Sequence, residues 1–305
     1  MELVNHIPIA FDSTFRLPLP VNHRFPMEKY DLLPEQLILE GISKITDFFK
    51  PTSPSLETVF QVHNSDYVER LCDLSLNKSE IRSIGFPLSD DLVKREFLIA
   101  GGTIKGCEMA FENGIAMNIA GGTHHAFSGH GEAFCLLNDQ AIAAQYLLDN
   151  DRAKKILILD LDVHQGNGTA EIFRFNPYVF TCSFHGNKNY PFRKEISDLD
   201  IPFEDQTDDT NYLTKIKEII PRLIDKFQPD FIFYLCGVDV LKTDKLGRLG
   251  LTLEGCKKRD EFILNLCKLN KIPVQCSMGG GYSEEIKIII EAHANTFRMA
   301  KAIYV

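Results

Sequence analysis

Two carboxylates and an imidazole follow an apolar run near the middle of the chain. The run Ile156–Leu159 is followed by Asp160, Asp162 and His164. If the period-two pattern of a strand continues through this segment, the three polar side chains share one side. Neighbouring carboxylates resist ionisation unless a cation is present, and Asp and neutral His are good ligands for a divalent metal such as Zn²⁺. The alternative is that these groups cap the next helix and pair with basic residues.

Three other apolar runs also end in polar residues that could take part in catalysis. The adjacent His124 and His125 follow a glycine pair, Asp239 follows a second run, and Tyr282 follows a triple glycine that includes Gly280. Taken alone, each residue is more often a cap, a turn residue or a packing residue. Because ligands bind at the carboxyl ends of parallel strands, we expect all four strand ends to meet at one edge. The joint pattern therefore predicts a metal-dependent active site.

Strands and helices in alternation must position these residues. The apolar runs are nearly continuous in hydrophobicity, which is typical of parallel strands buried on both faces. Helical spacing of apolar residues predicts helices over Pro34–Phe49 and Tyr212–Phe227, and Ser283 begins a last helix. A further helix over Ala141–Leu148 follows a cap at Asn138 or Asp139. The predicted strands are Ile115–Ala120, Lys155–Asp162, Tyr178–Phe184, Phe231–Gly237 and Pro273–Met278.

These elements predict an α/β fold in one domain over residues 1–305, with an open, mostly parallel sheet and helices on both faces. The most linker-like stretches, Pro51–Ser55 and Ile201–Thr210, are too short to mark a domain boundary.

The composition is that of an ordinary globular protein. Hydrophobic residues make up 44% and charged residues 25% of the 305 residues, which argues against disorder and against a membrane bundle. The formal charge of -9 disfavours a direct nucleic-acid partner. With no signal peptide pattern and no apolar run near the ~20 residues of a membrane span, we expect a cytoplasmic protein whose eight cysteines are reduced.

The quoted segments resemble the histone deacetylase family of the arginase/deacetylase superfamily. The family's ordered signatures match GGTHHAFSGHGEAFCLLND, LDLDVHQGNGTAEIF, GVDVLKTDKLGRLGL and GGGY, between about Ala100 and Tyr282. The resemblance implies an arginase/deacetylase-like fold and a zinc-dependent amidohydrolase that releases a carboxylic acid and a free amine from acyl-lysine or a similar acyl-amine. The segments most like class IV enzymes and their bacterial relatives are Gly101–Thr103, Gln165, Asn167, Asp244–Gly247 and Pro18–Tyr30.

The resemblance also implies two metal sites. Asp162, His164 and Asp239 would hold one Zn²⁺ per chain, with an open position for water and the substrate carbonyl. A structural K⁺ ion would be held by oxygens of Asp160, Asp162, His164, Ser183 and Phe184.

The catalytic roles follow from the same resemblance. His125 would act as general base and then protonate the leaving amine, and His124, with Asp160 as its partner, would lie beside it. Tyr282 would donate a hydrogen bond to the oxyanion. Asn167 stands where many family members have an Asp that orients the second histidine. Because an amide stabilises an imidazolium less than a carboxylate does, we expect a lower pKa for His125 than in those relatives.

The substrate would be an acyl-lysine protein or peptide, or an acylated polyamine. The resemblance implies that Phe134 lines one wall of an acyl-lysine tunnel, that Tyr190 supplies another aromatic wall, and that Gly280 contacts the substrate. Aromatic walls suit an aliphatic stem because they bury its methylene groups.

Two rival functions share this fold. An arginase-like ureohydrolase would need carboxylates two residues beyond His164 and Asp239 for a second metal ion, and these positions are Gly166 and Leu241. A non-catalytic acyl-lysine-binding protein is the other rival, although every residue that the chemistry needs is present. A nucleotide site is a weaker interpretation because the glycines after His164 lack the complete GxGxxG spacing.

Overall fold

One parallel sheet forms the centre of the molecule in the computed structural model, which describes residues 6–305. Its eight strands lie in the order β2-β1-β3-β8-β7-β4-β5-β6, and every pairing between neighbours is parallel. The predicted α/β class is therefore confirmed. The strands are β1 (Ile9–Ala10), β2 (Phe48–Phe49), β3 (Ile115–Asn118), β4 (Ile156–Asp160), β5 (Val179–Gly186), β6 (Leu199–Phe203), β7 (Phe231–Leu235) and β8 (Val274–Ser277).

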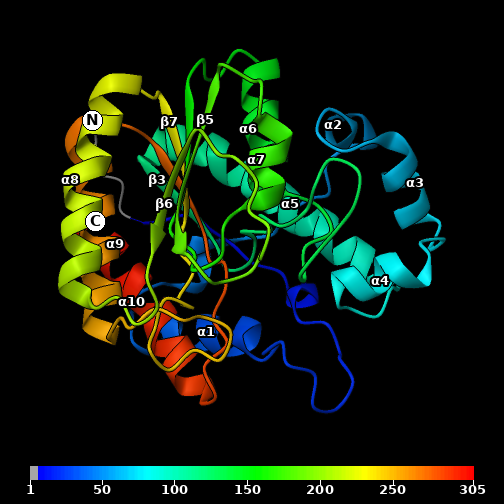
Figure 1. The fold of residues 1–305 in the computed structure, drawn as a ribbon, viewed down its shortest axis with the longest axis horizontal. Coiled ribbons are helices and arrows are strands. Elements are labelled where there is room, and N and C mark those ends of the chain that lie inside the picture. Colours follow the sequence, from blue (N-terminus) through cyan, green and yellow to red (C-terminus); the bar gives the residue numbers. More distant parts are fainter. Residues whose placement is uncertain (1–5) are drawn as a thin grey trace.

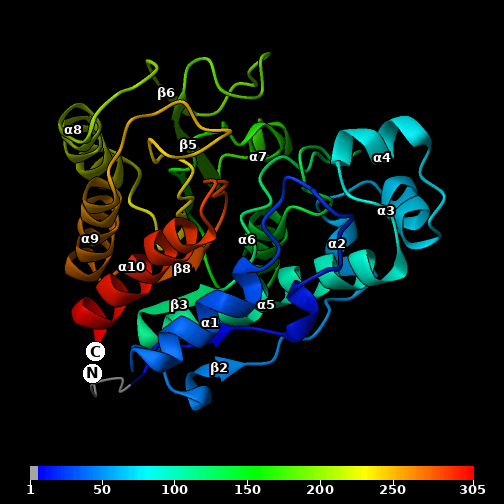
Figure 2. The ribbon, with the colours of Figure 1, turned by 90° about the horizontal axis from the view of Figure 1, so that it is seen from below.

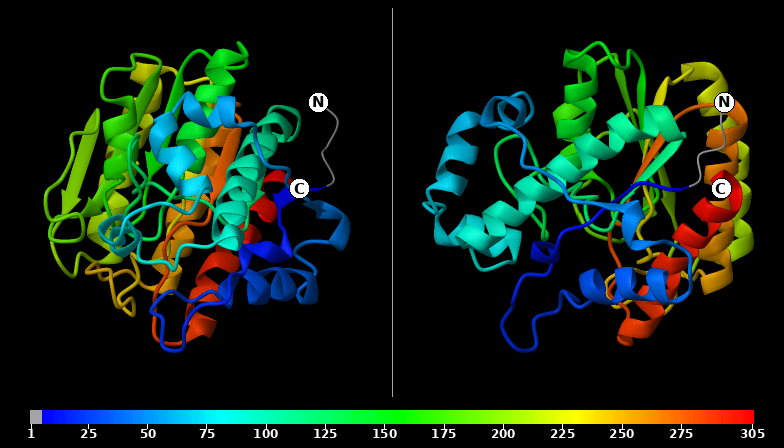
Figure 3. Two further views of the ribbon diagram at one scale, coloured as in Figure 1. Left: turned by 90° about the vertical axis from the view of Figure 1, so that its right-hand side faces the viewer. Right: turned by 180° about the vertical axis from the view of Figure 1, so that it is seen from behind.

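Helices cover both faces of this sheet (Figures 1 and 2). On one face α5 packs against β3 and β8 and against α6, and on the other α8, α9, α10 and α1 form a continuous series of contacts. The short helices α2, α3 and α4 gather at one side of the molecule (Figure 3). The helices are α1 (Lys29–Leu39), α2 (Leu56–Phe60), α3 (Ser65–Cys72), α4 (Lys78–Ile84), α5 (Asp90–Asn113), α6 (Asp139–Asp149), α7 (Asn167–Phe173), α8 (Asp209–Phe227), α9 (Leu253–Asn270) and α10 (Ile286–Tyr304).

The four strands whose ends carry the predicted site residues are neighbours in the sheet. The order β3-β8-β7-β4 places the loops after these strands side by side at one edge. Their residues are fully buried, as expected for parallel strands covered on both faces. The sheet order therefore explains how residues from His124 to Tyr282 reach one place.

The predicted helix over Pro34–Phe49 is wrong in its second half. Helix α1 ends at Leu39, and Gly41 follows with a φ of 66°, a left-handed conformation that glycine adopts readily. The N–H of Ile42 then bonds to the carbonyl of Leu37, which closes the helix end. The remaining apolar residues lie outside the helix, and Phe48–Phe49 instead pairs with β1 as the edge strand β2.

The linker-like stretch Ile201–Thr210 is also corrected, because its first three residues belong to β6. This strand is the other edge of the sheet, where Pro202 is tolerated since one side of the strand needs no ladder hydrogen bonds. The predicted helix over Tyr212–Phe227 is confirmed as part of α8, with Pro221 inside it. No helix within residues 6–305 has both the length and the apolar character needed to cross a bilayer.

Candidate active site

The polar side chains at the end of β4 are brought together by a turn, and not by the alternation of side chains along a strand. The strand ends at Asp160, whose Oδ1 accepts the N–H of Asp162 at 3.0 Å. The Oδ1 of Asp162 in turn accepts the N–H of His164 at 2.9 Å. Successive bonds from side chain to backbone therefore hold this segment at the end of the strand. The prediction that the three side chains share one face of a continuing strand is wrong, although their convergence is correct.

Asp162, His164 and Asp239 form a buried group whose donor atoms suit a metal ion. One ligand atom from each residue lies within 4.8 Å of the other two. The Nδ1 of His164 is 3.1 Å from Asp162 Oδ1 and 3.1 Å from Asp239 Oδ2. Burial and the nearby Asp162 charge raise the pKa of Asp239 to about 7. Two carboxylates confined this closely are stabilised by a divalent cation, and an O, N, O donor set fits Zn²⁺.

The adjacent histidines lie on the loop after β3, which Asp139 holds in place. Its Oδ1 accepts the N–H groups of Gly122 at 2.8 Å and Thr123 at 2.9 Å. Gly122 has a φ of 77°, and a Cβ at this position would lie 2.9 Å from the backbone of Gly279. The loop can therefore pass this close to the neighbouring strand end only with glycine here.

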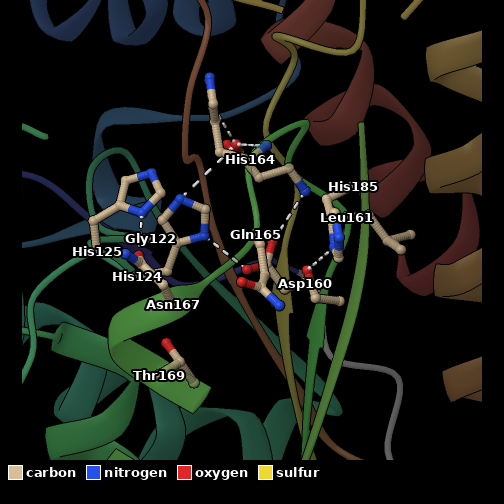
Figure 4. Close-up of polar contacts among 12 residues, drawn as sticks. Gly122, His124, His125, Asp160, Leu161, His164, Gln165, Asn167, Thr169 and His185 are labelled. Carbon is tan, nitrogen blue, oxygen red and sulfur yellow. Dashed lines mark hydrogen bonds and ion pairs between the residues drawn. The ribbon is translucent and has the colours of Figure 1, made fainter. Parts of the chain in front are cut away.

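Each histidine of the pair donates from Nδ1 to a different partner (Figure 4). His124 Nδ1 is 2.7 Å from Asp160 Oδ2, and His125 Nδ1 is 2.6 Å from Asn167 Oδ1. Burial opposes protonation of His124, but the Asp160 carboxylate outweighs it and raises the pKa of the ring. Burial and the neighbouring His124 and His164 lower the pKa of His125 well below its ordinary value. His125 is therefore the ring of the pair that is neutral at neutral pH and can accept a proton.

Tyr282 is held by its backbone beside the candidate metal-binding group. Its N–H donates to Asp244 Oδ2 at 2.6 Å, and Asp244 Oδ1 also accepts the N–H groups of Leu246 and Gly247. Lys29 lies under the tyrosine ring, 6.0 Å from its centroid, and donates to the Gly279 carbonyl at 3.1 Å. The loop after β8 is therefore fixed from two sides.

A cavity of about 580 Å³ opens onto this group. His125, Tyr282 and the three residues named for substrate contact all line it, so the structure brings these predicted residues together. The ring of Tyr190 meets His125 edge on at a centroid distance of 5.0 Å. Phe134 is buried and packs edge-on against Phe25, and Gly280 donates its N–H to Asp162 Oδ2 at 2.9 Å. Gly280 thus also holds the carboxylate of Asp162, one of the three candidate metal ligands.

The residues expected around K⁺ are also neighbours. Asp160 and Ser183 are register partners in the pairing of β4 with β5, and Ser183 and Phe184 are buried. Ser183 Oγ lies 3.0 Å from the Nδ1 of His185.

A buried arginine ties two of the strand ends to α9. Arg259 is fully buried, pairs with Asp260, and donates to the carbonyl oxygens of Leu161, Cys236 and Gly237. The Leu161 carbonyl lies directly before Asp162 in the sequence, and those of Cys236 and Gly237 lie shortly before Asp239. Sequence reasoning missed Arg259, Asp139 and Asp244, because all three act through backbone groups of distant loops.

The arginase-like rival finds no support at the two positions it needs. A Cβ on Gly166 would meet Asp160 Oδ2 at 2.5 Å, so a larger ligand there has no room. Leu241 is buried in the hydrophobic core. Within residues 6–305, the group of Asp162, His164 and Asp239 is the one cluster of three His, Cys, Asp or Glu side chains suited to a metal.

The chain is similar in sequence to several known proteins. The chain is 40% identical over 297 residues to an uncharacterized protein of Picosynechococcus sp., covering 97% of this chain and 99% of that one. It is 30% identical to histone deacetylase 9 of Arabidopsis thaliana, covering 87% of this chain and 66% of the relative. It is also 30% identical to the histone deacetylase clr6 of Schizosaccharomyces pombe, covering 86% and 67%. The chain thus spans about two thirds of these two deacetylases.

Among solved structures, the HDA15 HD domain matches with a TM-score of 0.81, at 20% identity over 97% of this chain and 88% of that one. This likeness shows a common fold. The model of the histone deacetylase domain matches residues 23–297, which include all of the predicted site residues. The chain therefore belongs to the histone deacetylase family.

Proposed function

We propose that this protein is a zinc-dependent hydrolase of acyl-lysine or similar acyl-amine bonds. The observation that carries the proposal is that Asp162 and His164, which form a buried group with Asp239, line one cavity together with His125 and Tyr282. Three protein ligands are the pattern of catalytic zinc sites, which keep a position open for water and substrate. When bound, Zn²⁺ would polarise the amide carbonyl and lower the pKa of a water molecule.

The chain's own residues supply the proton transfers. His125 is neutral, and its Nδ1 donates to Asn167, so its Nε2 is free to accept a proton from water and to pass it to the leaving amine. His124, whose pKa Asp160 raises, would place a positive charge beside the reacting carbonyl. Tyr282 keeps its proton because burial raises its pKa well above the ordinary value, so the phenol can donate to the oxyanion.

The substrate class is an acylated primary amine. Acetyl-lysine in a protein or peptide is the first candidate, and longer acyl-lysine or acylated polyamine are alternatives within the same chemistry. The aromatic rings of Phe134 and Tyr190 along the cavity suit the aliphatic stem of such an amine. We also propose a structural K⁺ near Asp160 and Ser183, which are register partners in the pairing of β4 with β5.

The test is a substrate panel of acetyl-lysine peptide, myristoyl-lysine peptide and acetylated polyamine. We expect hydrolysis of at least one substrate by the Zn²⁺-loaded protein, loss of activity with a chelator, and recovery when Zn²⁺ is returned. His125→Ala should lower kcat by about 10²-fold or more, the usual contribution of a general base. A protein that binds acyl-lysine peptide but hydrolyses none of the substrates would refute the enzyme and favour a binding protein.

A further inference from the structure

A single carboxylate outside the mechanism contacts two of the groups that surround His125. Glu132 lies on the loop between β3 and α6, with 26% of its side chain exposed. Its Oε2 accepts from the Tyr190 hydroxyl and from the Asn167 Nδ2, the latter at 3.4 Å. Its Oε1 is 3.3 Å from the Nε2 of His130. The Glu132 carboxylate therefore touches the amide that pairs with His125 and the ring that packs against it.

The donor and acceptor roles in this chain of contacts depend on one another. An ionised carboxylate only accepts hydrogen bonds, so the Asn167 amide must turn its Nδ2 toward Glu132. The Oδ1 then faces His125 and can only accept, which places the hydrogen of His125 on Nδ1. If the amide were rotated by 180°, its oxygen would face the carboxylate and its NH₂ would face His125. Two oxygens in contact without a hydrogen between them disfavour that arrangement.

Glu132 is kept ionised by its own neighbours. The hydrogen bond with His130, together with those from Tyr190 and Asn167, lowers the pKa of Glu132 although the group is half-buried. In return, Glu132 raises the pKa of His130, whose side chain is 45% exposed. Glu132 therefore carries its charge at neutral pH, where its carboxylate can only accept hydrogen bonds.

We propose that Glu132 is a positioning residue that fixes the orientation of the Asn167 amide and, through it, the tautomer of His125. This inference rests on the proposed function for its effect on catalysis. An amide at position 167 can present either its oxygen or its NH₂, whereas a carboxylate there presents oxygen in either orientation. Because this protein has Asn at position 167, a second group must select the orientation of the side-chain amide, and Glu132 is placed to do so.

The test is a double-mutant cycle on Glu132 and Asn167. Glu132→Gln removes the charge and can donate as well as accept, so the Asn167 amide is free to turn. We expect kcat to fall about tenfold, the usual effect of losing a group that orients a catalytic side chain, with KM within about twofold. In the Asn167→Asp background, the same Glu132→Gln change should lower kcat less than twofold. An equal loss in both backgrounds would indicate a merely structural role and overturn the proposal.

Glu171→Gln is the matched control. Glu171 holds the same loop by accepting from the N–H and hydroxyl of Ser128, at 3.0 Å and 2.9 Å, and its hydrogen bonds are made there and not with Asn167. We expect its kcat to stay within about threefold of wild type in both backgrounds, since loosening the loop alone leaves the Asn167 contact intact. A tenfold loss of kcat in Glu171→Gln would indicate that loosening this loop, and not loss of the contact with Asn167, explains the effect of Glu132→Gln.

A second measurement does not depend on activity. The ¹⁵N chemical shifts of the His125 ring, in the metal-free protein at pH 7.5, should show the Nδ1–H tautomer in wild type and a mixture in Glu132→Gln. An unchanged tautomer in Glu132→Gln would overturn the proposal even if catalysis is impaired. If the wild type hydrolyses no acyl-amine, the proposed function fails, and the tautomer still decides the role of Glu132.

Discussion

Adding one methyl group at Gly280 should disable the metal site without unfolding the protein. A Cβ at this position would lie 2.0 Å from Asp239 Oδ2 and 2.9 Å from Asp162 Oδ2. Because real Cβ contacts below 3.0 Å are essentially absent, the Asp239 oxygen must move by about 1 Å. It cannot move freely, since Asp239 is fully buried and its Oδ1 accepts the N–H of Val163 at 3.0 Å.

Zinc ligands must lie within about 0.2 Å of their preferred distances, so a 1 Å displacement removes or weakens one of three protein ligands. We expect the Zn²⁺ affinity of Gly280→Ala to fall about 10- to 100-fold, which corresponds to ~1.4–2.7 kcal/mol. Competition with a chromophoric chelator measures this affinity, and far-UV circular dichroism with urea unfolding measures the fold.

Gly106→Ala is the matched control. Gly106 lies inside α5, and the nearest atoms to a Cβ there are 3.5 Å and 3.7 Å away, an ordinary contact. This change should leave Zn²⁺ affinity unaltered and stabilise the helix by about 0.5–1 kcal/mol. If Gly280→Ala binds Zn²⁺ within twofold of wild type while remaining folded, the proposed role of Asp162 and Asp239 as ligands is refuted.

Two further predictions concern histidines. Asn167→Asp places a carboxylate against His125 and should raise the pKa of this ring, because the carboxylate stabilises the imidazolium. The acidic limb of kcat/KM, which reports protonation of the base, should then move to higher pH. A pH–rate profile whose acidic limb stays in place would contradict this. Burial lowers the pKa of His63, which accepts the N–H of Asn138, to about 4. In the unfolded state His63 has its ordinary pKa of about 6.5, so it is protonated there before it is protonated in the folded state. The neutral, buried His63 therefore stabilises the fold above pH ~6.5, and the free energy of unfolding falls by about 1 kcal/mol through this residue between pH 7.5 and 5.5. Urea unfolding at the two pH values should show a drop in the free energy of unfolding that is smaller by this amount in His63→Gln than in wild type. Equal drops in the two proteins would contradict the prediction.

The central strands could be predicted because strands buried on both faces are continuously apolar. The outer strands could not, since the edge strand β2 and its neighbour β1 contain two residues each and the other edge strand, β6, contains a proline. A two-residue strand carries no period, and its pairing depends on partners distant in the sequence. The prediction of a helix over residues 40–49 failed because the apolar residues there have helical spacing, whereas the turn at Gly41 ends α1 earlier.

The site residues were predicted more fully than the groups that orient them. Asp162, His164 and Asp239 stand at strand ends, where their residue types indicate ligands. Asp139 follows the cap of a helix in the sequence, and only the fold reveals that its carboxylate accepts from the histidine loop. Contacts from a side chain to a distant backbone leave no periodic signal, so the chain must be folded to find them.

The buried Arg259 also determines when the active site can exist during synthesis. Its guanidinium bonds carbonyls after β4 and β7, and the helix that carries it follows both strands in the chain. A ribosome that has made only the first 250 residues has produced the carboxylates of the metal site but neither Arg259 nor Tyr282. If the site binds a metal ion, firm retention of that ion should therefore come late in synthesis, after α9 has docked against these strand ends.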